Sequence, residues 1–390
     1  MKHGTPHIMR LVTGLVATMA VASEATAASG KFLLIRRDMR VQTVEVAQIG
    51  QRLVFREDGG GWASVAIDRC VALLRTDTLI TPRHQGWLTL TDGQSFPGQA
   101  LSGARVAEDA FVWNQSSWLG RMEVPLDHVA SVVFDPGTTV PTAGEQDVLL
   151  LVNGDRVEGF ITALGDPVSL ELRDDGNGST SIELPLDRVR AVRMVSPPRK
   201  PSGQRLWLVD GTIVDVERVV LGDDGYYRFE GISFTEQDSV RVAPAGVAAV
   251  LFDPSALVPF ASLQPRRVEG PPMRYVVPRP EVRDGRAALG LFEVEFRGPL
   301  AAHYVLPSGA TYFGAEARLP EPARPWGDCV LSIRDNGQEI FTARLNAETP
   351  TAVIGVRLTG SMLTVEVAEG SGGPIQDRVV LVRAMILVEE

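Results

Sequence analysis

The chain has 390 residues, of which 44% are hydrophobic and 22% charged, and its formal net charge is −10 at pH 7. This length allows two to four domains with hydrophobic cores of their own. The acidic balance and the lack of a basic tract argue against binding to nucleic acid. The 38 glycines, the 26 prolines and the absence of a long amphipathic period predict an all-β protein.

The first residues predict a targeting segment. Lys2 and Arg10 provide positive charge, an apolar run of twelve residues follows, and Ala25-Thr26-Ala27 is typical of a cleavage site. The apolar run is too short to span a bilayer comfortably, and no later stretch approaches membrane length. We expect residues 1–27 to be a signal peptide and the mature chain to be exported, to the periplasm, the cell surface or the medium, without a membrane span.

A short sequence cassette that occurs four times predicts an array of repeats. Its second copy reads Val-Pro-Leu-Asp-His-Val-Ala-Ser-Val-Val-Phe at 124–134. Measured from Asp68 through Asp127, Asp187 and Ala245, the copies lie 59, 60 and 58 residues apart. A nearly constant period indicates a duplicated structural unit. We expect repeat units at 31–75, 85–134, 147–194 and 204–252.

Two apolar columns inside the cassette predict its local structure. The first column is Cys70, Val129, Val189 and Val247, and the second is Leu73, Val132, Val192 and Val250. A spacing of three does not fit a strand, but it fits one turn of 3₁₀ helix that leads into a strand. We expect Asp68, Asp127 and Asp187 to cap this turn through their side chains, and Cys70 to be a buried, poorly reactive thiol.

Turn signals in the repeats predict five short strands in each. Asp92-Gly93, Asn153-Gly154 and Asp210-Gly211 each follow an apolar run, as in tight hairpins. Five strands with a 3₁₀ turn before the last indicate a small SH3-like β-barrel. Residues 153–159 and 164–172 resemble the first motif of Sm-like barrels, but the Arg-Gly pair of that family's base-binding loop is absent. The resemblance therefore implies the shape and not RNA binding, and whether the barrels share strands stays open.

The sequence changes character after the repeats. Seven prolines between Phe252 and Ala287 predict a stiff linker at 253–286 with few packing contacts. Residues 287–390 contain about eight predicted strands, which is typical of a jelly-roll β-sandwich.

Five segments in this last part carry a family resemblance. They are His303–Pro307, Tyr312–Ala317, Val330–Glu339, Val356–Val367 and Asp377–Ala384. Together, over residues 289–387, they resemble the NPCBM domain, a carbohydrate-binding module found beside glycoside hydrolases. The resemblance implies a galactose-binding-like jelly roll that binds a glycan. The chain departs from the family at Gly290, which lacks the Gly-x-x-x-His pattern, and at Leu381, where the family has Trp.

A proline-rich loop between predicted strands contains the candidate ligand-binding residues Trp326, Arg324, Asp328 and Glu321. An indole face can stack on a sugar ring, while Arg324 donates hydrogen bonds and the two carboxylates accept them. The alternative is that Trp326 folds over the end of the sandwich as a packing residue. The other tryptophans, Trp62, Trp87, Trp113, Trp118 and Trp207, are expected to pack.

No sequence motif marks a catalytic, metal or cofactor site. The patterns HExxH, Cys-x-x-Cys, Gly-x-Ser-x-Gly and a Gly-rich phosphate loop are absent. The acidic stretches 174–178 and 223–225 lack further calcium ligands and predict hairpin turns. We therefore expect no cofactor, no metal and no catalytic residue. The prediction is an exported, non-enzymatic protein that binds a glycan or polysaccharide. The alternatives are a scaffold whose repeats bind a protein partner, and an enzyme with an unmarked carboxylate pair.

Overall fold

A computed structural model describes residues 30–389 except 39, 79, 82–85, 102–108, 116, 143, 174–178, 236, 272–275, 284–286 and 374. The predicted signal peptide and the acidic stretch 174–178 lie outside the described residues. The described part of the chain forms 32 strands and seven 3₁₀ helices of three residues each, which confirms the all-β prediction. No helix in these ranges is long and apolar enough to cross a membrane.

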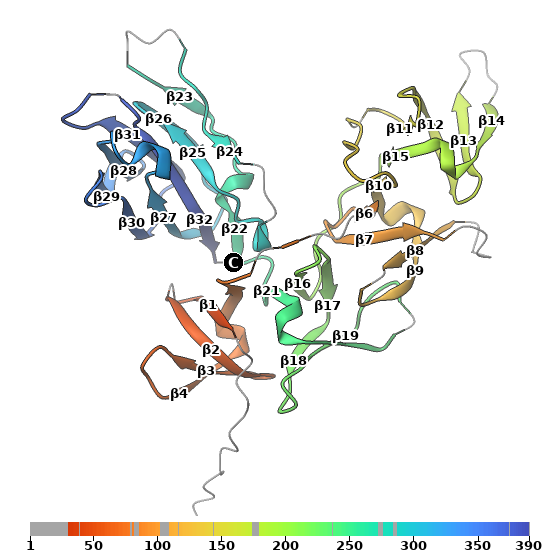
Figure 1. The fold of residues 1–390 in the computed structure, drawn as a ribbon, viewed down its shortest axis with the longest axis horizontal. Coiled ribbons are helices and arrows are strands. Elements are labelled where there is room, and N and C mark those ends of the chain that lie inside the picture. Colours follow the sequence, from red (N-terminus) through yellow and green to blue (C-terminus); the bar gives the residue numbers. More distant parts are fainter. Residues whose placement is uncertain are drawn as a thin grey trace, which may run out of the picture.

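The repeats share one order of elements (Figure 1). The first consists of β1 (Lys31–Arg36), β2 (Val41–Ile49), β3 (Arg52–Glu57), β4 (Trp62–Ala66), η1 (Ile67–Arg69) and β5 (Cys70–Arg75). The second consists of β6 (Gly86–Leu90), β7 (Ser95–Ala100), β8 (Ala110–Gln115), β9 (Gly120–Pro125), η2 (Leu126–His128) and β10 (Val129–Val133). The third consists of β11 (Asp147–Leu151), β12 (Arg156–Leu164), β13 (Val168–Arg173), β14 (Ser179–Leu184), η3 (Leu186–Arg188) and β15 (Val189–Arg193). In the fourth the second strand is split, giving β16 (Gln204–Leu208), β17 (Ile213–Val216), β18 (Arg218–Leu221), β19 (Tyr227–Glu230), β20 (Ser239–Val242), η4 (Pro244–Gly246) and β21 (Val247–Leu251).

Each repeat is an antiparallel sheet in which the first strand pairs with both the second and the last. This is the strand order of a small SH3-like barrel. No ladder between the fourth and the last strand is formed in the described residues, so the hydrogen-bonded sheet stays open and the expected closed barrel is not completed.

The predicted cassette is confirmed by burial. Cys70, Val129, Val189 and Val247 are each at most 3% exposed, and the second column is fully buried. The predicted 3₁₀ turn is present in all four repeats. The capping prediction is wrong, since no turn has a side-chain cap hydrogen bond. The residue at the N-cap is Ala66, Pro125 or Pro185, whose side chain has no hydrogen-bonding group. Each aspartate lies two positions after the cap, as the second residue of the turn.

The last strands of the repeats pair with one another, which settles that the repeats share sheets. β10 pairs with β15 around Val132↔Val192, and β5 pairs with β21 around Leu73↔Val250. The second repeat therefore joins the third, and the first joins the fourth. The same column of the cassette lies at the centre of both junctions.

Buried polar contacts lock the second repeat to the fourth. Gln115 is fully buried, and its Nε2 donates to Asp210 Oδ2 at 3.1 Å and to Thr212 Oγ1 at 3.0 Å. Arg205 binds Asp215 through two nitrogens at 2.6 and 2.8 Å and also donates to the carbonyl oxygen of Asp92. Because these groups are paired on burial, they fix the orientation of the two repeats.

The C-terminal part is a two-sheet sandwich, as predicted. One sheet has the order β24 (Glu281–Val282), β25 (Val294–Arg297), β32 (Arg378–Val388), β27 (Ala310–Arg318) and β30 (Thr351–Arg357), with β22 (Leu257–Pro259) also on β32. The other has the order β23 (Arg267–Glu269), β26 (Leu300–Val305), β31 (Met362–Glu369), β28 (Cys329–Asp335) and β29 (Gln338–Leu345). The short helices here are η5 (Phe260–Ser262), η6 (Ala288–Gly290) and η7 (Glu321–Ala323).

The prediction that 253–286 has few packing contacts is wrong. β22 pairs with β32, and β23 pairs with β26, so this segment contributes a strand to each sheet of the sandwich. Phe260 is 1% exposed, and its ring centroid lies 4.6 Å from that of Tyr304. Pro259 ends β22, and Pro265 and Pro280 precede β23 and β24, so the prolines leave these short ladders intact, which their number alone does not reveal.

The sandwich packs against the first and fourth repeats. Val71, Leu74, Ala248 and Leu251 lie on the outward face of the β5–β21 pair, in one apolar cluster with sandwich residues. Those sandwich residues include Leu257, Leu289, Leu291, Tyr312, Met385 and Leu387. In Figure 1 the sandwich lies above the first repeat, and the fourth repeat lies between the first repeat and the other two.

Replacing Val189 with Ala should lower the free energy of unfolding by about 1–3 kcal/mol, because it removes fully packed methyl groups from the core column. Val152→Ala in the same repeat is the control, since Val152 is 47% exposed and should cost much less. Urea unfolding measures both. Equal effects of the two variants would contradict the assignment of the column.

Replacing Phe260 with Ala should cost about 3–5 kcal/mol, because its ring is buried against two other aromatic rings of the sandwich. Thermal unfolding of the mature chain is the measurement. A loss below about 1 kcal/mol would mean that the segment behaves as the free linker expected from its prolines.

Candidate functional site

The loop that follows β27 folds around a buried alanine. Ala323 is fully buried, and its carbonyl oxygen accepts hydrogen bonds from the N–H groups of Trp326 at 3.1 Å and Gly327 at 2.7 Å. The N–H of Ala323 donates to Pro320 at 2.8 Å. The prolines and these short-range bonds hold the backbone while its side chains project outward.

Trp326 is 72% exposed, so the alternative that it packs over the sandwich end is wrong. Glu321 and Arg324 are exposed in the same loop, and Arg324 Nε is 3.5 Å from the carbonyl oxygen of Leu319. The loop thus exposes an indole, a guanidinium and a carboxylate within six consecutive residues. These are the groups that stack on a sugar ring and bind its hydroxyls.

Asp328 binds other residues of the sandwich through its carboxylate. Arg344 binds both of its carboxylate oxygens at 2.7 Å, and Ser371 donates from its N–H and hydroxyl groups at 2.9 and 2.7 Å. The hydrogen bonds from Arg344 and Ser371 hold the pKa of the Asp328 carboxyl well below its usual range. Because its acceptors are already engaged, Asp328 braces the loop rather than presenting a free acceptor.

A second carboxyl group lies at the base of this region. Asp377 is 2% exposed, and burial, with a smaller contribution from the Asp328 and Glu369 carboxylates, raises its pKa to about 6. The backbone N–H of Asp328 acts in the opposite direction without reversing the shift. The carbonyl oxygen of Asp377 accepts from Gly298 N–H at 2.7 Å.

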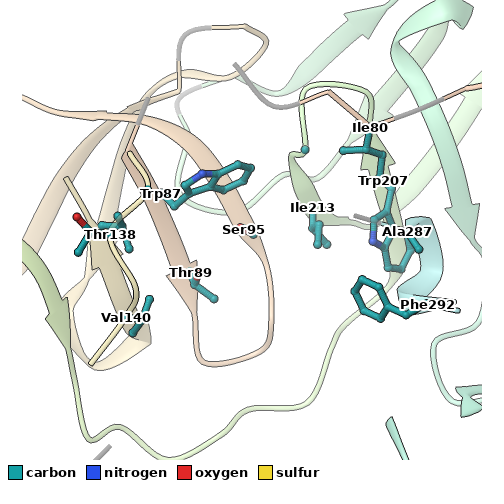
Figure 2. Close-up of a pocket in the computed structure, with 13 residues that line it drawn as sticks. Ile80, Trp87, Thr89, Ser95, Thr138, Val140, Trp207, Ile213, Ala287 and Phe292 are labelled. Carbon is teal, nitrogen blue, oxygen red and sulfur yellow. The ribbon is translucent and has the colours of Figure 1, made fainter. Parts of the chain in front are cut away.

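An aromatic cleft of about 450 Å³ lies between the second and fourth repeats and the sandwich. Trp87 stands on one wall, and Trp207, Ile213 and Phe292 form the other (Figure 2). The remaining lining residues include the hydroxyl-bearing Thr89, Ser95 and Thr138, and no charged side chain. A Cβ at Gly211 would lie 2.6 Å from Trp87 Cη2, so glycine at φ +93° is what allows the indole to approach the fourth repeat.

The prediction that all the other tryptophans pack is wrong for Trp62 and holds only in part for Trp87. Trp113 and Trp207 are buried, at 0% and 7% exposed, but Trp62 is 48% exposed and Trp87 is half-buried. Sequence reasoning missed the cleft because the residues of its second wall, Trp207, Ile213 and Phe292, lie 120 to 205 residues after Trp87. The usable signal in the sequence is Gly211, which follows Asp210 and lies against Trp87 of β6.

The acidic stretch 223–225 is a turn, as its sequence predicts. Asp224 forms ion pairs with Arg228 and Arg241 and accepts from Tyr226 N–H, as a turn residue does. Within the described ranges no three acidic, histidine or cysteine side chains gather as metal ligands. Cys70 and Cys329 are free and buried, and burial raises the pKa of each thiol to about 12.

The comparisons with known proteins find structural neighbours only. No family model and no curated protein matches the chain. Among solved structures, the chain is similar to the CBM51 module from Clostridium perfringens GH95 in complex with methyl-galactose, with 12% identity, a TM-score of 0.28, and coverage of 33% of this chain and 99% of that one.

Two further neighbours also contain CBM51 modules. The CBM51-2 and INT domains from Clostridium perfringens ZmpB give 12% identity and a TM-score of 0.29, over 42% of this chain and 37% of that one. The tandem CBM51 modules of the family 98 glycoside hydrolase from Streptococcus pneumoniae SP3-BS71 give 9% identity and a TM-score of 0.29, over 92% and 88%. Similarity at this level does not carry a function from one chain to another.

Replacing Asp377 with Asn tests the buried carboxyl. The folded-state pKa of about 6 lies above the ordinary value of 3.8, so the folded chain binds this proton more tightly than the unfolded chain. Its contribution to stability is therefore present below pH 4 and lost as the pH rises through 6. The variant should gain on the order of 1–3 kcal/mol over the wild type between pH 4 and 7. Denaturant unfolding at several pH values measures this, and a constant difference would contradict it.

Proposed function

We propose that this protein is an exported, non-enzymatic carbohydrate-binding protein whose glycan site is the loop of Glu321, Arg324 and Trp326. The observation that carries the proposal is Trp326, an indole 72% exposed on a backbone held by its own hydrogen bonds. Exposure of a large aromatic face to water costs free energy that a stacked sugar ring recovers. A loop that is already ordered also loses little entropy on binding.

The chemistry around Trp326 supports a sugar rather than an apolar ligand. Arg324 supplies several N–H donors and Glu321 supplies acceptors, within five residues of the indole. The Asp328–Arg344 ion pair fixes the far end of the loop, at 2.7 Å for each of two contacts. The resemblance of residues 289–387 to the NPCBM domain supports the same class of ligand. The apolar run at the N-terminus supports export.

Replacing Trp326 with Ala should weaken glycan binding at least about tenfold, because the stacking surface is lost. The melting temperature should change little, since the side chain is exposed. Trp62→Ala is the matched control, since Trp62 is also exposed, at 48%, but lies in the first repeat. A glycan array followed by calorimetric titration provides the readout. Unchanged binding by the Trp326 variant would refute this site, and hydrolysis of a bound glycan would refute the non-enzymatic assignment.

A further inference from the structure

A second cavity of about 450 Å³ adjoins the aromatic cleft. Ile80, Ala287 and Phe292 line both cavities, so the two spaces meet at these residues. The second cavity differs in charge. Arginines from three segments line it, namely Arg75, Arg283 and Arg383, with Glu293 as the only carboxylate among its lining residues. Glu293 itself is bound by Arg283 and by Arg318.

Arg383 is held in an unusual backbone conformation. Its φ is +52°, a left-handed value that is uncommon for a residue with a side chain. It lies in β32 where the pairing with β27 shifts register between Gly314 and Glu316. Bulges of this kind redirect a side chain, and strained residues concentrate at functional sites. A residue with a strained backbone therefore lines the cavity.

The guanidinium of Arg383 retains donors for a ligand. Glu316 is bound by Nη2 at 2.5 Å, while Nε and Nη1 make no hydrogen bond to a described residue. Arg283, in contrast, uses Nε, Nη1 and Nη2 on Glu293 and Glu295. A carboxylate suits these remaining donors, because guanidinium N–H groups form short, charge-assisted hydrogen bonds with carboxylate oxygens.

We propose that the two adjoining cavities form a second binding site, for a saccharide that carries one carboxylate. The carboxylate would bind Arg383, and the neutral part of the ligand would lie along Phe292 toward Trp207 and Trp87. The charge-free cleft, with three aromatic rings and the hydroxyls of Thr89, Ser95 and Thr138, fits uncharged sugar rings. A net charge of −10 on the chain opposes long polyanions, which favours a single acidic group.

This site is separate from the one proposed above. No residue that lines either cavity belongs to the loop of Glu321, Arg324 and Trp326. The lining residues come from the first, second and fourth repeats and from the sandwich, so the site exists only in the assembled chain. A substitution that abolishes binding at one site should therefore leave binding at the other site measurable.

The test is an array of glycans that end in a uronic or sialic acid, each printed beside its neutral counterpart, probed with the full mature chain. Arg383→Gly is the decisive variant, because glycine adopts φ +52° without strain while the whole side chain, including the guanidinium, is removed. Binding of acidic glycans should fall at least tenfold, while the melting temperature stays the same or rises. Phe292→Leu should weaken the same glycans, and Trp326→Ala should leave them unchanged. Arg334→Gln, on β28 and outside both cavities, is the matched control.

Three results would overturn the proposal. They are no preference for acidic over neutral glycans, equal binding by wild type and Arg383→Gly, and equal competition by acetate or by a Glu-rich peptide, which would indicate a simple anion or protein site. If Arg383→Gly lowers the melting temperature, Arg383→Asn replaces it, because Asn tolerates the left-handed region. Retained binding by the Asn variant contradicts the proposal equally.

Discussion

The packing of the β5–β21 pair against the sandwich is the contact on which the rest of the arrangement depends. Leucine and valine side chains of both repeats meet the sandwich there in one buried cluster. Each fully buried side chain of this size contributes roughly 1.5–3 kcal/mol relative to exposure, so the junction is strong enough to fix the two parts. Ala72 and Ala249 lie between these larger residues, and their small size allows the sandwich to approach closely.

Fixing this junction positions both proposed sites. The aromatic cleft and the arginine-lined cavity take their walls from the repeats and from the segment that leads into the sandwich. The Gln115 and Arg205 contacts hold the second repeat, and Trp87 with it, against the fourth. The loop of Trp326 lies instead within the sandwich, so it requires only that domain's own core. One chain thus presents an exposed aromatic loop and, apart from it, two adjoining open cavities with different chemistry.

Much of the fold could be predicted from the sequence, because the buried positions of the repeat are apolar in all four copies. The spacing of apolar residues predicts the two buried columns, which begin with Cys70 and Leu73, and the 3₁₀ turn. The Asp-Gly and Asn-Gly pairs predict the hairpins, in which glycine has a positive φ. The pairing of last strands could not be predicted, because strand registers across 60 or 180 residues leave no local pattern. One usable signal exists. The position after the first column is apolar, as Val71 and Ala248, in the repeats that contact the sandwich and is Arg190 in the third repeat, but Ala130 in the second repeat does not follow this division.

The site was predictable only in part. An exposed Trp in a proline-rich loop is a local feature, and Trp326 and its neighbours Arg324 and Glu321 could be named. The engagement of Asp328 by Arg344 depends on a strand that lies across the sheet, which local sequence does not specify. The same holds for the linker, where Phe260 enters the core from a segment whose composition is typical of an extended chain.

The most direct test of carbohydrate binding uses the six indole N–H resonances of the mature chain, one for each tryptophan, followed by NMR during titration with a bound glycan. We expect a neutral glycan to shift the Trp326 resonance selectively, while the resonance of the buried Trp113 stays unchanged. Shifts confined to tryptophans of the repeats, or none at saturation, would contradict it.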